Sequence, residues 1–521
     1  MGRSKKSQKR KKRPAATQTT RPRRDRRLFF MAVLFVFVGV VALLVYWNFT
    51  AVQHLPLFSS FKSSKAKPPF ADLFMDLSPR RPPAAPNPVS YADFVGSKAC
   101  QRCHPQQYTQ WQHSAHGKAG GRPGEVKIIS PFNGPPLHYK DATVTPVKKG
   151  DSLYYFKVER TGRKPKIFRV AAVIGGGHMV GGGTQTYFTS FPDGTLRFLP
   201  FDFNRNNRVW FSQTRDSLHW IPVSKSLALS QLSEWPPKRV LGTTLDFPNC
   251  QNCHGSQISI DYDPLEKHYR TRFTTLAINC ESCHGPGRRH VDLMQSGKPI
   301  ENGDIGLASL ATMSKDASLQ VCFQCHAVKD PLKNGYLPGM PLESYYSLKL
   351  PMLAQDPYQP DGRIRRFGYQ QNHLYSDCYL NGSMTCVDCH APHSLNYRDI
   401  WGQALPGRFN NGQCTDCHPS KALHLKAHTH HGVNSPGSLC TSCHMPYLQH
   451  PSLGKRVKFT RSDHTIPIPR PQFDARLGIE NACSKCHPGK SVASLQAKVD
   501  YWYGRVKPHK PIVKALFDAA P

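Results

Sequence analysis

Cysteine and histidine recur in one short pattern, Cys-x-x-Cys-His, at eight places in this 521-residue chain. The patterns, numbered motifs 1 to 8 in chain order, use 16 of the 17 cysteines. Chance placement with this composition would produce about 0.03 such patterns, so the repetition is not accidental. The cysteine pairs are Cys100 and Cys103, Cys250 and Cys253, Cys280 and Cys283, Cys322 and Cys325, Cys386 and Cys389, Cys414 and Cys417, Cys440 and Cys443, and Cys483 and Cys486. The histidines that end the motifs are His104, His254, His284, His326, His390, His418, His444 and His487.

This spacing suits the covalent attachment of haem. Two thiols three positions apart lie on one helical turn and can add across the two vinyl groups of a haem, while the next histidine donates a nitrogen to the iron. A zinc ribbon does not need histidine after every second cysteine, and a thioredoxin-type redox pair occurs once per domain. A disulfide framework would not repeat one local spacing eight times. The motifs therefore predict eight covalently bound haem c groups with these histidines as proximal iron ligands.

The composition fits a chain whose interior is filled by cofactors. Hydrophobic residues make up only 39% of the chain, and it contains 45 prolines and 38 glycines. Residues 97–521 would provide about 53 residues per haem, so the porphyrins are expected to form much of the core. Seven motifs lie within residues 250–487, and motif 1 stands 150 residues upstream of motif 2.

The first 48 residues predict a membrane anchor. Residues 1–27 hold 13 lysines and arginines and one acid, and residues 28–47 are uncharged and mostly apolar. Twenty helical residues span about 30 Å, the thickness of the hydrocarbon layer. No small-x-small cleavage site follows, so an uncleaved signal anchor is favoured over a removed signal peptide. The basic cluster places the N-terminus in the cytoplasm and the haem domain in the periplasm of a bacterial inner membrane.

The net charge of +35 overstates the basicity of the external part of the chain. Residues 1–27 account for +12 of it, which leaves +23 for the remainder. Eight haems add 16 propionates, so the external part would carry about +7 when reduced and about +15 when oxidised. We therefore expect no nucleic-acid partner, and the remaining charge could steer an acidic partner or an anion.

The fold expected from these patterns is a multihaem cytochrome c. Short α-helices and loops would wrap around eight haems, with a small β-rich insert and one N-terminal transmembrane helix. Strand-like alternation and a hairpin pattern at residues 184–199 predict the insert, which would be scaffold or a docking surface. A last helix is expected at residues 491–503. The expected segments are a basic tail (1–27), a signal anchor (28–48), a proline-rich tether (49–96), a first haem segment (97–137), the β-rich insert (138–235) and a seven-haem domain (236–521).

Several longer stretches resemble a known family. Cys-Thr-Ser-Cys-His-Met-Pro from Cys440, Arg-Ser-Asp-His-Thr-Ile-Pro from Arg461 and Cys-Glu-Ser-Cys-His-Gly-Pro-Gly from Cys280 resemble the periplasmic multihaem cytochromes with doubled CxxCH motifs. Many members of that family carry tetratricopeptide repeats, and the resemblance covers residues 97–504. More distantly, the pattern is similar to the octahaem group of hydroxylamine oxidoreductases and of nitrite and tetrathionate reductases.

Seventeen further histidines are available as second, distal iron ligands. The family resemblance favours His116, His290, His393, His431 and His464, and more weakly His373, His428 and His268. His178 lies in a glycine-rich run and could be a distal ligand or a loop tip. Cys378, the one cysteine outside the motifs, could be a packed thiol, an axial or reactive thiolate beside a haem, or half of an intermolecular disulfide.

The leading functional expectation is electron transfer. A membrane-anchored octahaem cytochrome would conduct through closely spaced, mostly bis-histidine haems between a quinol-oxidising membrane complex and a periplasmic or outer-membrane acceptor. The alternative is a reductase or oxidase of a small nitrogen or sulfur species at one five-coordinate haem. The Cys-x-x-Cys-Lys variant that marks the catalytic haem in related nitrite reductases is absent, which favours the carrier over the enzyme. A haem-based sensor is a third hypothesis, although no output domain is visible.

Overall fold

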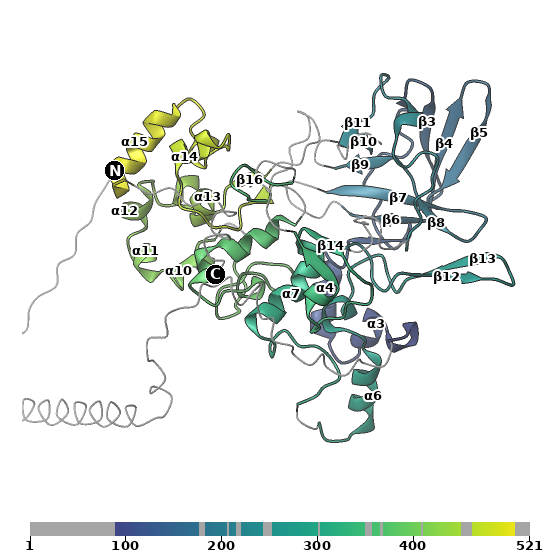
Figure 1. The fold of residues 1–521 in the computed structure, drawn as a ribbon, viewed down its shortest axis with the longest axis horizontal. Helices are drawn as coiled ribbons and strands as arrows, with labels where there is room; N and C mark the ends of the chain where they lie inside the picture. Colours follow the sequence, from purple (N-terminus) through teal and green to yellow (C-terminus); the bar gives the residue numbers. More distant parts are fainter. Residues whose placement is uncertain are drawn as a thin grey trace, which may run out of the picture. The chain divides into compact units, whose positions relative to one another are not determined.

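Two antiparallel sheets occupy the region between motif 1 and motif 2 in the computed structural model of the chain (Figure 1). The structure describes residues 89–176, 183–205, 208–214, 220–242, 253–300, 303–349, 357–364, 368–407, 410–449 and 461–505. The expected tail, signal anchor and most of the tether therefore lie outside the described residues. No helix in the described ranges is long and apolar enough to cross a membrane.

The first sheet has four strands in the order β2-β3-β4-β5. Alternation along β4 turns Phe156 and Val158 into the core, while Lys157 and Glu159 point outward and form an ion pair of 2.7 Å. The second sheet has seven strands, six of them in the order β1-β6-β7-β9-β10-β11, and β8 pairs with the last residues of β7. The strands of both sheets are β1 (Gly120–Gly121), β2 (Leu137–His138), β3 (Thr143–Lys149), β4 (Leu153–Arg160), β5 (Arg163–Arg169), β6 (Ala172–Ile174), β7 (Thr184–Ser190), β8 (Leu196–Phe198), β9 (Asp202–Asn204), β10 (Val209–Gln213) and β11 (Trp220–Pro222).

The hairpin expected at residues 184–199 is present as β7 and β8. Its turn contains Gly194 with a φ of +84°, a conformation that glycine adopts without strain. The chain contains more strands than the small insert that we expected, because β1 and three two-stranded sheets lie outside residues 138–235. These are β12 (Ser259–Asp263) with β13 (His268–Arg272), β14 (Lys329–Pro331) with β15 (Tyr346–Leu348), and β16 (Tyr447–Gln449) with β17 (Arg461–Ser462).

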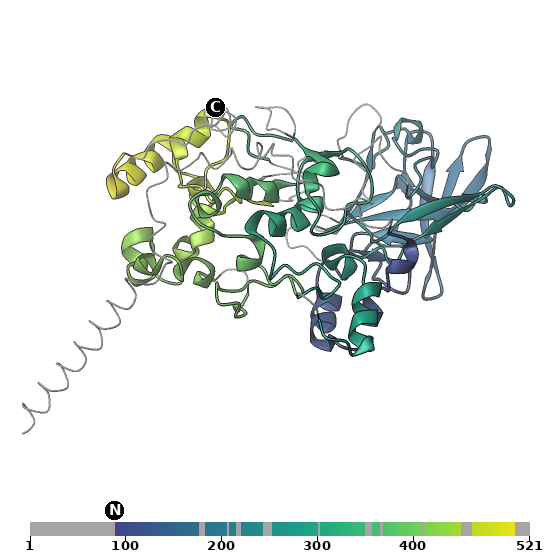
Figure 2. The ribbon, with the colours of Figure 1, turned by 60° about the horizontal axis from the view of Figure 1, so that its bottom comes forward.

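The helices are short and alternate with loops from motif 3 onward, as Figures 1 and 2 show. The last helix matches the expected position, and the Ser491 hydroxyl caps it by accepting from the Ser494 N–H at 3.2 Å. The helices are α3 (Ser97–Cys100), α4 (Pro105–His113), α5 (Glu281–His284), α6 (Arg288–Ser296), α7 (Lys315–His326), α8 (Asp377–Leu380), α9 (Cys386–Cys389), α10 (Gly412–Thr415), α11 (Pro419–Leu423), α12 (Leu425–Thr429), α13 (Cys440–His444), α14 (Pro471–Arg476) and α15 (Val492–Tyr503).

Buried apolar side chains are concentrated in the strand-rich region. The largest cluster draws its buried members from residues 137–235, including Phe156, Tyr187 and Phe201, each 0% exposed. The helical region has a much smaller cluster around Leu319 and Phe323 of α7. Because so many short helices cannot be held together by so few apolar contacts, another component must fill the helical region.

Candidate haem sites

The fully described motifs fold as helical turns, and motif 4 forms the last turn of the longer helix α7. In five of them the backbone N–H of the terminal histidine donates to the carbonyl of the first cysteine at 2.9–3.0 Å. This bond closes a turn that places both thiols and the imidazole on one side of the backbone. The motifs with this bond end at His104, His284, His390, His418 and His487. Cys250, the first cysteine of motif 2, lies outside the described residues.

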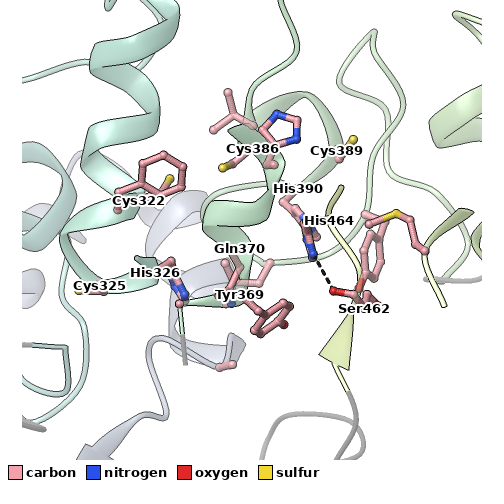
Figure 3. A pocket seen from close by; sticks show the side chains of 18 of the residues that line it. Cys322, Cys325, His326, Tyr369, Gln370, Cys386, Cys389, His390, Ser462 and His464 are labelled. Atoms are coloured by element: carbon pink, nitrogen blue, oxygen red, sulfur yellow. Dashed lines mark hydrogen bonds between the residues drawn. The ribbon is translucent and has the colours of Figure 1, made fainter. Parts of the chain in front are cut away.

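A cavity of about 2580 Å³ runs through the helical region. Cysteines or histidines from motifs 2 to 8 line it, so the attachment residues converge on one connected space. Figure 3 shows His326 of motif 4 and His390 of motif 5 in this cavity, with Tyr369 and Gln370 between them. Haem groups attached to these cysteines would occupy this space and complete the helical core.

Five motif histidines face a second histidine across a gap of constant width. Their ring centres are 6.1–6.2 Å apart. The pairs are His104 with His290, His326 with His116, His284 with His393, His444 with His428, and His487 with His431.

The gap fits one iron atom between two imidazoles. A metal–nitrogen bond of about 2.0 Å, plus about 1.1 Å from nitrogen to ring centre on each side, gives about 6.2 Å between ring centres. Imidazoles in direct contact would not hold this spacing five times over. The residues present therefore fit bis-histidine haem c, and the haems would supply reversible one-electron chemistry when bound.

Hydrogen bonds at the far ring nitrogen orient several of these imidazoles. The Nδ1 atoms of His284 and His290 lie 2.9 and 2.7 Å from the carbonyls of Ala308 and Ile305. Equivalent contacts join His431 to Thr429 at 2.5 Å and His444 to Pro467 at 3.0 Å. When the proton is held on Nδ1, Nε2 carries the free electron pair that can bind a metal.

Burial keeps the central imidazoles neutral. Desolvation lowers the pKa of His116 to about 4 and that of His326 to about 3. It also lowers the pKa of His390 to about 4. Neutral imidazole is the form that binds iron, so these rings are ready to ligate at neutral pH.

The other expected distal ligands lie in different environments. His464 lines the cavity near His390, and its Nδ1 lies 3.1 Å from the Ser462 carbonyl (Figure 3). Both ring nitrogens of His373 are engaged, with Nε2 3.0 Å from the Met384 carbonyl and Nδ1 3.2 Å from the Ser376 hydroxyl. His268 lies on β13 with its ring against Gly194 of the β7–β8 turn. Their roles as ligands stay predictions.

Three proximal histidines have no second imidazole among the described residues at the ring-centre distance of 6.1–6.2 Å found in the five pairs. They are His254, His390 and His418, and all three line the cavity. His178, the other candidate that the sequence singled out, lies outside the described residues. Cys378 also lines the cavity, and burial raises the pKa of its thiol, which favours a protonated, packed side chain.

Polar side chains of the strand-rich region form one end of the cavity, a feature that the sequence did not predict. Thr186 of β7, Asn204 of β9, Gln213 of β10 and Arg239 line it together with His254. Behind them, burial raises the pKa of Asp202 to about 7. The Arg239 guanidinium pairs with Glu234 at 3.1 Å. No sequence signal would have singled these residues out, because they meet only when β7, β9 and β10 pair.

Comparison with known proteins agrees with the motifs. Residues 99–125 match the family described as cytochrome c554 and c-prime. The chain is 23% identical over 404 residues to the dissimilatory sulfite reductase MccA of Wolinella succinogenes, covering 68% of this chain and 51% of that protein. The chain thus spans about half the length of that relative.

Two solved structures are also similar. The outer cell wall cytochrome OcwA has a TM-score of 0.47 and 16% identity, covering 79% of this chain and 87% of that one. The octaheme sulfite reductase MccA from Wolinella succinogenes has a TM-score of 0.34 and 17% identity, covering 74% and 60%. The motifs and the sequence similarity identify the chain as a multihaem c-type cytochrome that binds haem c covalently.

Proposed function

We propose that the protein binds eight haem c groups and carries electrons along them. The observation that carries the proposal is that cysteines of different motifs contact one another. Cys100 contacts Cys280, Cys322 contacts Cys386, and Cys414 contacts Cys440. Because each motif cysteine is bonded to the edge of a porphyrin, contacting cysteines bring two porphyrin edges together.

The positions of the motif cysteines support one order of the haems along the electron-transfer path. Motif 1 touches motif 3, and motif 4 touches motif 5. Cys283 lies near Cys322 and Cys443 lies near Cys483, which places motif 3 beside motif 4 and motif 7 beside motif 8. Cys389 and Cys414 link motif 5 to 6, which contacts motif 7. The order is therefore 1-3-4-5-6-7-8.

Motif 2 is a branch of this chain. The Cys253 thiol donates to the Cys325 carbonyl of motif 4 at 3.6 Å, and the two side chains are also in contact. Among the described motif cysteines, Cys253 thus connects motif 2 to motif 4, and we propose that motif 2 joins the order above as a branch at this point.

The sequence supports a place for this chain between membrane and periplasm. In the proposal, the signal anchor at residues 28–48 holds the protein on the inner membrane, with the N-terminus cytoplasmic. Residues 49–96 act as a tether. Electrons would enter from a quinol-oxidising membrane complex and leave to a periplasmic or outer-membrane acceptor.

Removal of single haems tests the order. The variant Cys386→Ala/Cys389→Ala should lack haem 5 and divide the chain, so that reduction by a limiting amount of dithionite becomes biphasic. The matched control Cys250→Ala/Cys253→Ala should lack haem 2 and retain single-phase kinetics, because motif 2 is a branch. Haem number is checked by mass spectrometry and folding by circular dichroism. Indistinguishable kinetics in the two variants would refute the order.

A second candidate function is the reduction of a small nitrogen or sulfur oxyanion beside His254. The polar end of the cavity favours it, because Arg239 offers a cation there and Asp202, with its pKa raised to about 7, holds a proton near neutral pH. A haem on a branch could receive electrons without interrupting the chain. The similarity to a protein named a sulfite reductase is consistent with this chemistry.

Electron paramagnetic resonance separates the two functions. A high-spin signal in the oxidised protein that changes with nitrite, hydroxylamine or sulfite, and no longer changes in Arg239→Met, would support the reductase. A spectrum that is entirely low-spin and unaffected by these ligands would refute the reductase and leave electron transfer as the one supported function. Lys164→Met, on exposed β5, is the control for loss of one cation.

A further inference from the structure

We propose that the surface formed by α11, α12 and the end of α15 is a docking site for a small acidic electron-transfer protein, which exchanges electrons at the haem of motif 8. This inference rests on the proposed function, because it assigns one end of the electron-transfer chain. The observations are a groove, its contact with a haem ligand, and its charge.

An apolar groove of about 840 Å³ lies between α12 and α15. Leu423 is 80% exposed and Val433 is 59% exposed, although both are aliphatic. Exposed aliphatic side chains that gather around a groove mark a surface suited to binding. We call this surface the α12–α15 groove; it is lined by Ala422, Leu423, His424, Leu425, Lys426, Ala427, His430, Val433 and Trp502.

One aromatic ring connects the groove to the histidine that faces motif 8. Trp502 stacks on His430 with ring centres 4.5 Å apart and an interplanar angle of 10°. The same indole lies 6.3 Å from His431, the imidazole that faces His487. A partner seated in the groove would therefore contact a side chain that touches a haem ligand.

Some of the cysteines that would attach haem are also exposed on this side. Among the described motif cysteines, only Cys103, Cys417 and Cys486 are exposed. Cys417 lies two residues before the start of α11, and Cys486 belongs to motif 8. The thioether edges of haems 6 and 8 would thus be accessible, whereas those in the middle of the chain are more covered.

The charge around the groove selects the partner. Lys426 lines the groove and Lys421 lies on α11, and both are exposed, as are Lys498 and Arg505 on or just after α15. The exposed acids of residues 412–431 and 492–505 are Asp416 and Asp500. An apolar centre with a cationic rim complements a protein whose acidic side chains surround its redox centre. Such a charge pattern speeds association at low ionic strength and loses its effect in salt.

The test follows electron transfer from the dithionite-reduced holoprotein to oxidised cytochrome b5, a small acidic haem protein, by stopped flow. Lys421→Glu/Lys426→Glu should lower the second-order rate constant about tenfold at low ionic strength, and the difference should vanish at high salt. Lys164→Glu/Lys166→Glu, at two exposed positions of β5, makes the same change in net charge away from the groove and should leave the rate near wild type.

Two further measurements separate the possible failures. Equal slowing by both double variants would show an effect of net charge alone and would overturn the docking site, as would no slowing by either. Concentration-dependent dimerisation that Leu423→Ser abolishes would assign the groove to a second copy and also overturn the proposal. Oxidation by ferricyanide needs no docking protein, so loss of that reaction would indicate failure of the electron-transfer chain itself.

Discussion

His428 and His431 lie three residues apart at the end of α12 and face two different haem motifs. His428 faces His444 with parallel rings, and His431 faces His487. The histidine between them, His430, turns the other way and stacks on Trp502. Tyr503 donates from its hydroxyl to the His428 carbonyl, so α15 holds this turn in place.

This arrangement predicts opposite results for adjacent histidines. His431→Ala should remove one axial ligand and convert one haem to a high-spin form, which electron paramagnetic resonance of the oxidised protein would detect. His430→Ala should leave every haem in its wild-type spin state, because this ring lies on Trp502. A high-spin signal from His430→Ala would contradict the assignment.

Glu281 joins motif 3 to the segment before motif 1. Its side chain is 2% exposed and accepts hydrogen bonds from the N–H groups of Val95, Gly96 and Gly287 at 2.8–2.9 Å. Replacing it with alanine leaves one buried and two part-buried N–H donors without this partner. We expect Glu281→Ala to lower the free energy of unfolding by about 3–5 kcal/mol in chemical denaturation.

The control for this prediction is Glu159→Ala on β4. Glu159 forms an ion pair with Lys157 on the surface, where its side chain is 42% exposed. Its loss should change the stability by less than about 1 kcal/mol. Similar losses for the two variants would show that Glu281 does not have the structural role described.

Arg363 is a buried cation shared by carboxylates from three segments. It pairs with Asp361 at 2.7 Å, with Asp463 at 2.6 Å and with Asp474 at 3.5 Å. Arg363→Leu would leave buried carboxylates uncompensated, and we expect a loss of about 3–5 kcal/mol in unfolding free energy.

A surface arginine provides the comparison. Arg289 pairs with Asp304 at 2.5 Å but is 65% exposed, so Arg289→Leu should cost less than about 1 kcal/mol. Because Asp463 precedes His464, Arg363→Leu should also alter the haem absorption spectrum, whereas Arg289→Leu should not. Equal stability losses would contradict the importance of burial at Arg363.

The buried carboxyl of Asp202 predicts a pH dependence of stability. Burial raises its folded-state pKa to about 7, whereas an unfolded aspartate titrates near pH 3.9. Between these values the folded state holds a proton that the unfolded state has lost, so stability falls as the pH rises from about 4 to about 7. The loss attributable to this group is at most about 4 kcal/mol.

Asp202→Asn should flatten this pH dependence. The measurement is the denaturation midpoint of the holoprotein at pH 5 to 8. Asp261→Asn is the control, since Asp261 is 49% exposed in its pair with Arg272 and should keep the wild-type slope. An unchanged slope in Asp202→Asn would mean that the carboxyl stays ionised in the folded protein.

The haem attachment motifs could be read from the sequence because their chemistry is local. Two thiols and an imidazole within five residues suffice to recognise covalent haem attachment, and the same short turn recurs in the structure. The hairpin at residues 184–199 and the last helix were also predictable, since alternation, turn residues and a capping serine act over a few positions.

The distal partners could not be derived from spacing alone. His104 faces His290, 186 residues later, and His326 faces His116, 210 residues earlier. The weaker candidate His428 stands opposite a motif histidine, whereas both nitrogens of His373 are occupied by hydrogen bonds. Only the folded chain decides which imidazole nitrogen is left free at the right distance.

The sequence by itself determined where haem is attached and which histidines lie on the proximal side, because adjacent residues carry that chemistry. The tertiary structure alone decided that motif 1 lies beside motif 3, that Cys253 of motif 2 lies against Cys325 of motif 4, and that β7, β9 and β10 close one end of the cavity. These relationships depend on contacts between segments far apart in the chain, which no local pattern encodes.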